Sequence, residues 1–315
     1  MTRSRNVAWA TMIGVALVLG APFSNSTVVM ANDDACARQQ GFYLRRDKLD
    51  ISIYNASIDA AAAEGAAISY TGDRENDTET AEIQALAAWV FARNPCSPVG
   101  DAPIGRPYVS GYAFALSVLG DGTLTADRTD EKSVLKPGLD AQIEIANGPI
   151  FDLQYLTATP YYQTDFRGEA QAYGFSASWQ PYQLDWRLGG RYTPFSRPFD
   201  FFYQLKLEAD GLRVNNPGLT DLTADTDYFW LGGTAMLRAS LFNGLLGWDR
   251  LLWVTSYTYF DDTNSKQSVR MFTTNLGYNF SKEGKTSISV EYQNGTERDT
   301  LEKLNQYLVT LNVKY

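Results

Sequence analysis

Charged side chains recur at alternate positions along many segments of this sequence. Apolar residues occupy the positions between them, as around Lys206 and Glu208 in "FFYQLKLEAD". Successive residues of a strand point to opposite faces, so one face of each strand would be polar and the other apolar. The residues predicted to lie on the polar face are Asp140, Glu144, Asp152, Asp185, Arg187, Arg191, Lys206, Glu208, Arg238, Glu291 and Lys314.

Two kinds of chemistry fit such a face. Arg187, Arg191, Lys206, Glu208 and Arg238 come from three successive segments and are predicted to be neighbours. They would form an electropositive strip that binds anionic or sugar solutes in a water-filled pore. The alternative is a set of salt bridges that fills a narrow barrel. Glycine has no side chain to fill the lumen, which favours an open pore, but glycine also occurs at bends in strands. The glycines concerned are Gly174, Gly189, Gly190, Gly232 and Gly233.

Enzymatic chemistry finds little support. The chain contains no histidine, the most frequent general base in hydrolases. It also lacks a G-x-S-x-G motif, a Cys/His metal spacing and a phosphate-binding glycine loop. The acidic stretch "YTGDREND" fits a solvated turn better than a calcium loop. We therefore expect no enzymatic activity and no cofactor.

The amino-terminal residues predict export. Arg3 and Arg5 precede a short apolar run, and small residues precede a cleavage position after Ala31. We interpret residues 1–31 as a signal peptide, because the apolar run is shorter than the roughly 20 residues of a membrane helix. Its removal takes away two of 27 basic residues and none of 36 acidic residues, which changes the net charge from −9 to −11. This acidic balance argues against a nucleic-acid partner.

Two cysteines, Cys36 and Cys96, follow this segment. An exported chain lies in a compartment where disulfides form, so we expect these two residues to pair. Two separate buried thiols are the alternative.

Alternating segments separated by turn residues predict an all-β fold. Eleven of them follow one another, at 106–120, 139–145, 150–162, 168–182, 184–195, 199–214, 227–242, 250–260, 269–280, 286–295 and 305–315. "ETAEIQALAAWVFAR" supplies a twelfth, although its residues are also good helix formers. We predict a transmembrane antiparallel β-barrel of about 12 strands over residues 79–315, after a short periplasmic or plug segment at 32–78. "ISIYNAS" and "AAISYTGD" would raise the count to 14.

The expected strand order also places the connections. An even number of strands brings both termini to one end of a barrel. "SKEGK" is then a short turn at that end, whereas "NNPGLTDLTADTD" and "NGTERDTLEKL" are loops at the other end. "GDGTLTADRTDEK" falls among the short turns and is too long for that position.

The carboxyl-terminal stretch "YLVTLNVKY" alternates to its last residue. Its apolar positions are Tyr307, Val309, Leu311, Val313 and Tyr315. In this respect the sequence resembles the porin-like class of bacterial outer-membrane β-barrels. The resemblance implies that these residues are the signal read by the barrel assembly machinery. It covers about residues 79–315 as architecture and indicates no subfamily.

Together these features predict a passive channel for small polar or anionic solutes in the outer membrane, with membrane lipid around it. Two alternatives remain open. One is a non-conducting structural or surface-interaction barrel, and the other is the outer-membrane conduit of a secretion or polysaccharide-export system. A secreted β-sandwich is the alternative fold. The sequence leaves the oligomeric state open.

Overall fold

The computed structural model describes residues 41–46, 65–73, 78–93, 106–125, 132–183, 185–189, 199–242, 251–280 and 285–313. These residues form thirteen strands and no helix. The strands are β1 (Gly41–Arg45), β2 (Ala66–Asp73), β3 (Thr78–Arg93), β4 (Tyr108–Thr125), β5 (Ser133–Ala146), β6 (Leu153–Gln163), β7 (Gln171–Tyr182), β8 (Phe199–Asn216), β9 (Thr226–Leu241), β10 (Leu251–Asp262), β11 (Ser268–Asn279), β12 (Thr286–Thr296) and β13 (Lys303–Val313).

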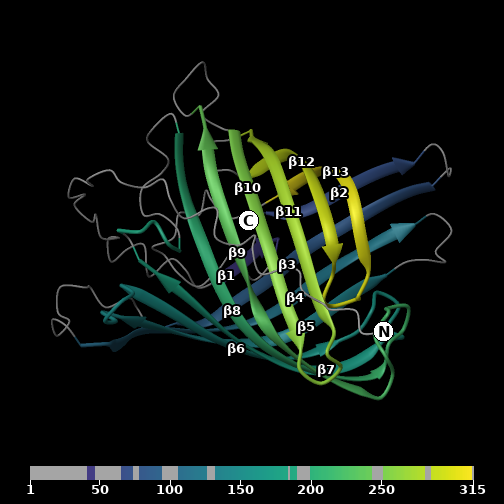
Figure 1. Ribbon diagram of the computed structural model, residues 1–315, viewed down its shortest axis with the longest axis horizontal. Helices are drawn as coiled ribbons and strands as arrows, with labels where there is room; N and C mark the ends of the chain where they lie inside the picture. The colour runs from purple at the N-terminus through teal and green to yellow at the C-terminus, as the bar shows by residue number, and fades with distance from the viewer. Residues whose placement is uncertain are drawn as a thin grey trace, which may run out of the picture.

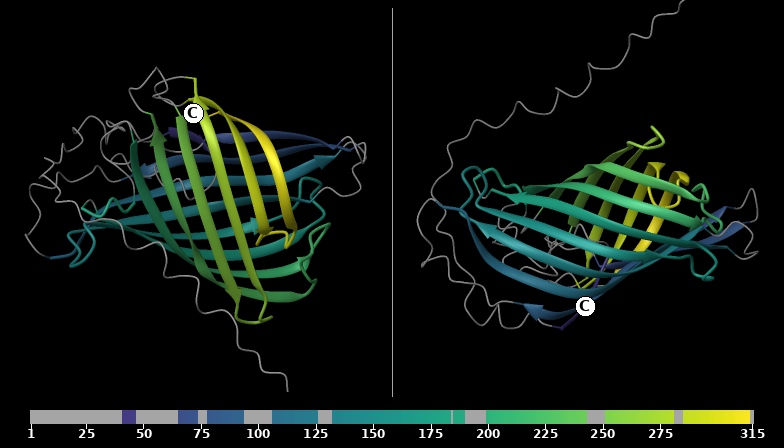
Figure 2. Two further views of the ribbon diagram at one scale, coloured as in Figure 1. Left: turned by 45° about the horizontal axis from the view of Figure 1, so that its top comes forward. Right: turned by 90° about the horizontal axis from the view of Figure 1, so that it is seen from below.

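The sheet closes on itself to form a barrel (Figures 1 and 2). From β2 to β13 each strand pairs antiparallel with the next one in the chain, and β13 pairs with β2 from Val309↔Tyr70 to Val313↔Ala66. The short strand β1 pairs with β3 beyond the stretch that pairs with β2. The predicted all-β, twelve-stranded antiparallel barrel is therefore confirmed, with one additional short strand.

The twelve strands are not the twelve that were predicted. "AAISYTGD" forms β2, so the barrel sheet begins at Ala66. The expected strand at 184–195 is wrong where the structure describes it. Gln183 and Leu188 close a tight turn through two backbone hydrogen bonds, and Arg187 within it has a positive φ of 58°. One strand gained and one lost leave the number unchanged. "ISIYNAS" lies outside the described residues.

Closure fixes which connections share an end. We call the end with the β12–β13 connection the loop end and the opposite one, where β13 finishes, the terminal end. The connections β4–β5, β8–β9 and β12–β13 share the loop end, because neighbouring strands run antiparallel. "GDGTLTADRTDEK", expected among the short turns, thus leads to the loop end. Its placement was wrong because the count was displaced by one strand before residue 106.

Alternation separates an apolar exterior from a mixed interior. On β13 the outward side chains Tyr307 and Val309 are 72% and 54% exposed, whereas Leu308 and Thr310 are 3% and 0% exposed. Exposed aromatic and aliphatic side chains recur on the outside of the other barrel strands. So much apolar surface exceeds what soluble monomers usually expose. The described part of the chain contains no helix long and apolar enough to span a membrane.

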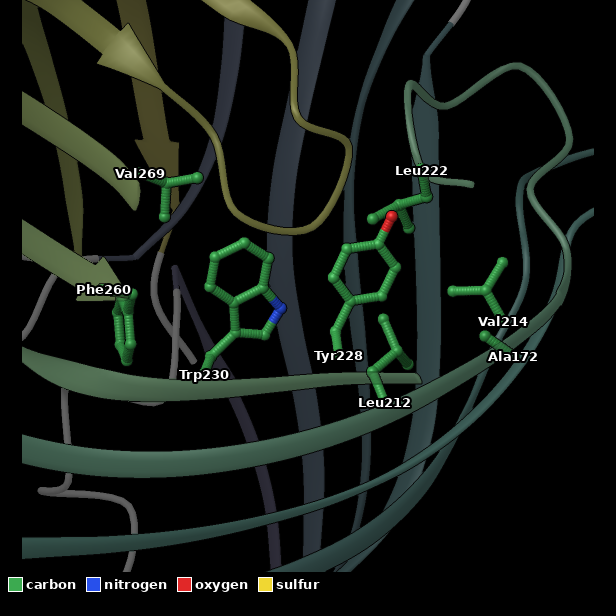
Figure 3. Close-up of a cluster of buried hydrophobic side chains, with 8 residues drawn as sticks. All are labelled: Ala172, Leu212, Val214, Leu222, Tyr228, Trp230, Phe260 and Val269. Carbon is green, nitrogen blue, oxygen red and sulfur yellow. The ribbon is translucent and has the colours of Figure 1, made fainter. Parts of the chain in front are cut away.

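Two large apolar clusters lie inside the barrel, and Met236 and Val254 form a smaller third one. The first gathers residues of β3, β4, β6 and β7, namely Leu86, Ala88, Val90, Ala113, Ala115, Tyr155 and Tyr182. The second is centred on Tyr228 and Trp230, whose rings stack with centroids 5.7 Å apart (Figure 3). Leu222 of the β8–β9 connection belongs to this second cluster, and Leu301 of the β12–β13 connection packs against it.

Candidate pore inside the barrel

Between these clusters lies a cavity of about 320 Å³. One part of its wall carries mainly hydroxyl groups, which can donate and accept hydrogen bonds without carrying charge. These residues come from β6, β7, β9, β10 and β11, and they are Thr157, Thr159, Ser176, Ser178, Thr234, Ser256, Thr258 and Thr273. Such a wall can replace the hydrogen bonds that a polar solute makes to water.

The β12–β13 connection, residues 297–302, folds into the lumen. The guanidinium of Arg298 forms ion pairs with Glu208 and Asp210 of β8, the second at 3.4 Å from Nη2 to Oδ2. It also lies 4.6 Å from the centre of the Phe260 ring on β10. One loop side chain therefore binds two neighbouring acids and an aromatic face of the barrel wall.

Further ion pairs extend from Arg298 in both directions. Asp299 accepts from Arg298 Nε at 3.2 Å and pairs with Lys136 Nζ of β5 at 2.6 Å. Glu208 pairs with Lys206 Nζ at 2.6 Å. We call this row, Lys206–Glu208–Arg298–Asp299–Lys136, the charge ladder. Charges of opposite sign alternate along it, so each has a partner.

The loop backbone is anchored as well. Gln163 Nε2 of β6 donates to the carbonyl of Asp299 at 3.3 Å. The backbone N–H of Asp221 in the β8–β9 connection donates to the carbonyl of Thr300 at 2.8 Å. Within the loop, the N–H of Glu297 donates to the carbonyl of Glu302 at 2.8 Å. These bonds fix the loop against both a strand and a neighbouring connection.

The carboxyl groups of the loop have opposite pKa shifts. Burial opposes ionisation of Asp299, but Lys136 and Arg298 outweigh it and lower the pKa of Asp299 to about 2. Burial raises the pKa of Glu297 to about 7, against a hydrogen bond from Thr300 Oγ1 at 2.6 Å. Nearby carboxylates add to this increase, and those facing Glu297 are Asp299, Glu302, Glu82 and Asp121. Glu297 is thus the loop group that titrates near neutral pH.

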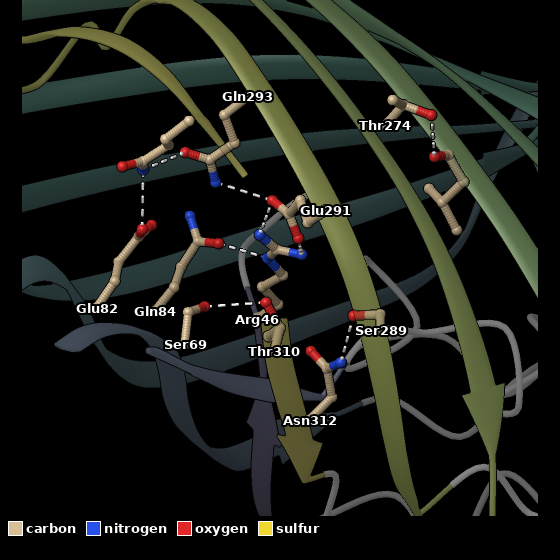
Figure 4. A network of polar contacts seen from close by, with 12 residues as sticks. Arg46, Ser69, Glu82, Gln84, Thr274, Ser289, Glu291, Gln293, Thr310 and Asn312 are labelled. Carbon is tan, nitrogen blue, oxygen red and sulfur yellow. Dashed lines mark hydrogen bonds and ion pairs between the residues drawn. The ribbon is translucent and has the colours of Figure 1, made fainter. Parts of the chain in front are cut away.

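A second polar network crosses the seam where β13 meets β2 (Figure 4). Arg46, which follows β1, donates from Nη1 and Nη2 to the two carboxylate oxygens of Glu291 on β12, at 2.7 and 2.5 Å. Its Nε also donates to Gln84 of β3. Gln293 Nε2 donates to Glu291 at 2.8 Å. The side chain of Glu291 is fully buried.

Gln306 of β13 extends this network toward β3. Its Nε2 lies 3.1 Å from both Glu82 Oε2 and Gln293 Oε1. Gln84 Nε2 donates to Asp121 Oδ2 of β4 at 2.8 Å. Side chains of β12 and β13 are thereby linked past β2 to side chains of β3 and β4, which stabilises the closure of the barrel from inside.

The structure separates the residues predicted to line the pore. Only Asp140, Lys206 and Glu208 of that set line the cavity. Three others do not line this cavity, namely Glu144, Arg238 and Glu291, although Glu291 binds Arg46 and Gln293 of its wall. Three lie in connections at the terminal end rather than on strands, namely Asp152, Asp185 and Arg187. The remaining predicted residues, Arg191, Lys314, Tyr315, Cys36 and Cys96, lie outside the described residues.

The expected electropositive strip is not formed by its described members. Arg187 pairs with Asp200 at the start of β8, whereas Lys206 pairs with Glu208 in the cavity. The strip was predicted from the wrong strand assignment at 184–195. Among the described residues, six basic and eight acidic side chains line the cavity, so its wall has no excess of positive charge.

Sequence reasoning missed several residues of this site. Asp210 is two positions beyond Glu208 and could have been found by continuing the same alternation. Lys136 lies on β5 before the predicted strand at 139–145, next to Pro137, a residue type that is uncommon inside strands. Arg298 and Asp299 lie in a connection, where alternation carries no information.

No group of three or more histidine, cysteine, aspartate or glutamate side chains suited to a metal ion occurs in the described part of the chain. The ion pairs and hydroxyl groups instead form a polar lining. Such a lining can form hydrogen bonds and ionic contacts with small polar solutes.

No protein-family model matches the sequence. No curated protein matches it. Among solved structures, a chain described as "KdgM porin" is 11% identical, with 79% of this chain and 98% of that chain covered and a TM-score of 0.34. A similarity this weak carries no argument about function, so the barrel assignment depends on the strand pairing itself.

Proposed function

We propose that this protein is an outer-membrane channel that conducts small polar solutes passively. The observation that carries the proposal is a polar cavity of about 320 Å³ inside a closed barrel whose exterior is apolar. A closed barrel satisfies every strand edge and can therefore cross a lipid bilayer. The predicted signal peptide and the outward side chains of β13 support export and recognition by the barrel assembly machinery.

The lining suggests how solutes would pass. Hydroxyl groups of β6, β7 and β9–β11 would replace water around a neutral polar solute. The paired charges of the ladder would hold that solute weakly, because each charge is already compensated. The acidic and basic side chains of the wall nearly balance, so we propose transport of small polar solutes without a preference for anions.

Single-channel recording in planar lipid bilayers tests this function. We expect discrete conductance steps from the purified protein. In a salt gradient, the reversal potential should be close to zero or should indicate weak selectivity for cations. Migration on gels before and after boiling would verify that the same sample holds the folded barrel. Folded protein that inserts into bilayers without conducting would refute the channel.

A second function is favoured by one specific observation. Apolar side chains form clusters within the barrel on both sides of the cavity, and Arg46 fills part of the lumen near the seam. A barrel packed in this way could serve as a structural or surface-interaction protein. Absence of conductance, together with protease accessibility of the 217–225 connection on intact cells, would support that function.

A further inference from the structure

We propose that the β12–β13 connection is the size filter of this channel, held across the lumen as a fixed constriction by the charge ladder. The inference rests on the proposed channel function and assigns to residues 297–302 the selection of solutes by size. It is supported by where the loop reaches, by how many contacts hold it, and by the space that it leaves.

The loop reaches the wall opposite its own strands. In the ring of twelve strands, β6 lies opposite β12, six strands away in either direction. Asp299 contacts Lys136 on β5 and, through its carbonyl, Gln163 on β6. Arg298 contacts Glu208 and Asp210 on β8. The connection therefore crosses the lumen instead of lying along one rim.

Its contacts are of different kinds, which favours a permanent position over a mobile lid. The Arg298 and Asp299 side chains are each 19% exposed, and the Glu208 side chain is 8% exposed. Withdrawal would leave Glu208 and Asp210 without Arg298. It would also remove Leu301 from the cluster around Trp230, beside which the yellow β12–β13 connection passes in Figure 3. Charged, apolar and backbone contacts would all have to break together.

The remaining space is small. A cavity of about 320 Å³ remains beside the loop, and Glu297, Arg298, Asp299 and Glu302 of the connection form part of its wall. Because the connection crosses the lumen beside this space, it narrows the path that a solute would follow. Residues 297–302 thus set the upper size limit.

The test compares the full-length protein with a shortened-loop variant, in which 298–301 are replaced by Asn-Gly, a pair that closes a tight hairpin. Unitary conductance is measured in planar bilayers, and uptake of glycerol, arabinose, glucose and sucrose is measured by liposome swelling. The unmodified protein should admit glycerol and exclude sucrose. The shortened loop should raise conductance by about twofold or more and should admit sucrose.

Two single variants keep the test decisive if the shortened loop does not fold. Arg298→Gln should raise conductance and the size limit, because it breaks the centre of the ladder. Arg213→Gln is the matched control, since Arg213 pairs with Asp227 at the same end of the barrel but on the exposed surface. This control should behave like the unmodified protein.

The outcomes separate the two proposals. If the unmodified protein conducts and the loop variants, verified as folded by heat-modifiable migration, keep its conductance and solute limit, the size filter is refuted while the channel stands. If single channels switch between the unmodified level and that of the shortened loop, the loop is a mobile gate and the fixed constriction is wrong. If neither the unmodified protein nor any variant conducts, the channel itself is refuted, and the size filter with it.

Discussion

Replacing Arg46 by methionine should destabilise the barrel strongly. The side chains of Arg46 and Glu291 are 7% and 0% exposed and share two hydrogen bonds. In Arg46→Met, Glu291 would keep hydrogen bonds from Gln293 and Asn275 but lose its counter-charge. Removing one partner of a buried ion pair costs about 3–5 kcal/mol. Because the pair lies near a polar cavity, we expect the lower end, about 3 kcal/mol.

Urea unfolding of the protein in detergent micelles measures this loss. The folded fraction is followed by gel migration without boiling and by tryptophan fluorescence. With an m-value of about 3 kcal/mol/M, a loss of about 3 kcal/mol lowers the midpoint by about 1 M urea. Methionine keeps most of the volume of the arginine stem, so the effect reports the lost charge more than a cavity.

Two companion variants decide the interpretation. Arg213→Met removes one partner of a pair whose side chains are 48% and 63% exposed, and should cost less than about 1 kcal/mol. The double variant Arg46→Met/Glu291→Met removes both buried charges and should recover to within about 1 kcal/mol of the unmodified protein. Equal midpoints for Arg46→Met and Arg213→Met would show that the buried pair does not stabilise the barrel.

Three further predictions concern the loop, the exterior and the lumen. Glu297 has a pKa raised to about 7, so its contribution to holding the loop is complete below about pH 4.5 and is lost as the pH rises through 7. The noise of the single-channel current should therefore increase as the pH rises through 7, and Glu297→Gln should remove this pH dependence. A pH-dependent noise that persists in Glu297→Gln would contradict the prediction. Val290→Arg puts a charge on the outward face near the middle of β12. It should lower the free energy of unfolding, measured with urea in lipid, by about 2–4 kcal/mol, whereas Val290→Ala should lower it only slightly. Equal losses in the two variants would argue against lipid contact. At Gly174 an added Cβ would lie 2.1 Å from the Tyr161 ring, so Gly174→Ala should cost about 1–3 kcal/mol by displacing the Tyr161 hydroxyl from Asp210, and an unchanged unfolding midpoint would be inconsistent with that packing.

The exterior of the barrel was predictable because alternation is a local property of each strand. On β13 the residues Tyr307, Val309, Leu311 and Val313 were expected on one face, and all four are exposed on the outside. Closure followed from the same pattern, since a long amphipathic sheet without closure leaves unpaired edges. The fold class could therefore be predicted without any known relative.

Strand identity was harder to predict. Residues 184–195 alternate as a strand would, but Gly189 has a φ of +92° and sits against the ring of Tyr182. Glycine accepts that conformation, and the chain turns. In β2 the alternating residues include Ala67 and Ser69, which are too small to give a strong apolar pattern. Both errors arise where side-chain size, rather than polarity, carries the information.

The candidate pore depends on a connection that strand periodicity does not describe. Lys206 and Glu208 were predicted to face inward, and they do. Arg298, the partner of Glu208, comes from ninety residues later in the chain. Nothing in "NGTERDTLEKL" distinguishes a loop that projects outward from one that folds inward. The expected anion-binding strip is not formed for two other reasons. Arg187 lies in a turn and pairs with Asp200, and Lys206 is neutralised by Glu208 on its own strand.

Cysteine accessibility along one strand tests the central claim, that solutes pass through the lumen of this barrel. Ser178 of β7 lines the cavity, and its neighbour Ala177 points outward. In a background with Cys36 and Cys96 replaced by serine, a cationic methanethiosulfonate reagent should reduce the conductance of Ser178→Cys and leave that of Ala177→Cys unchanged. Equal sensitivity of the two variants, or reduced conductance only in Ala177→Cys, would contradict a conducting lumen.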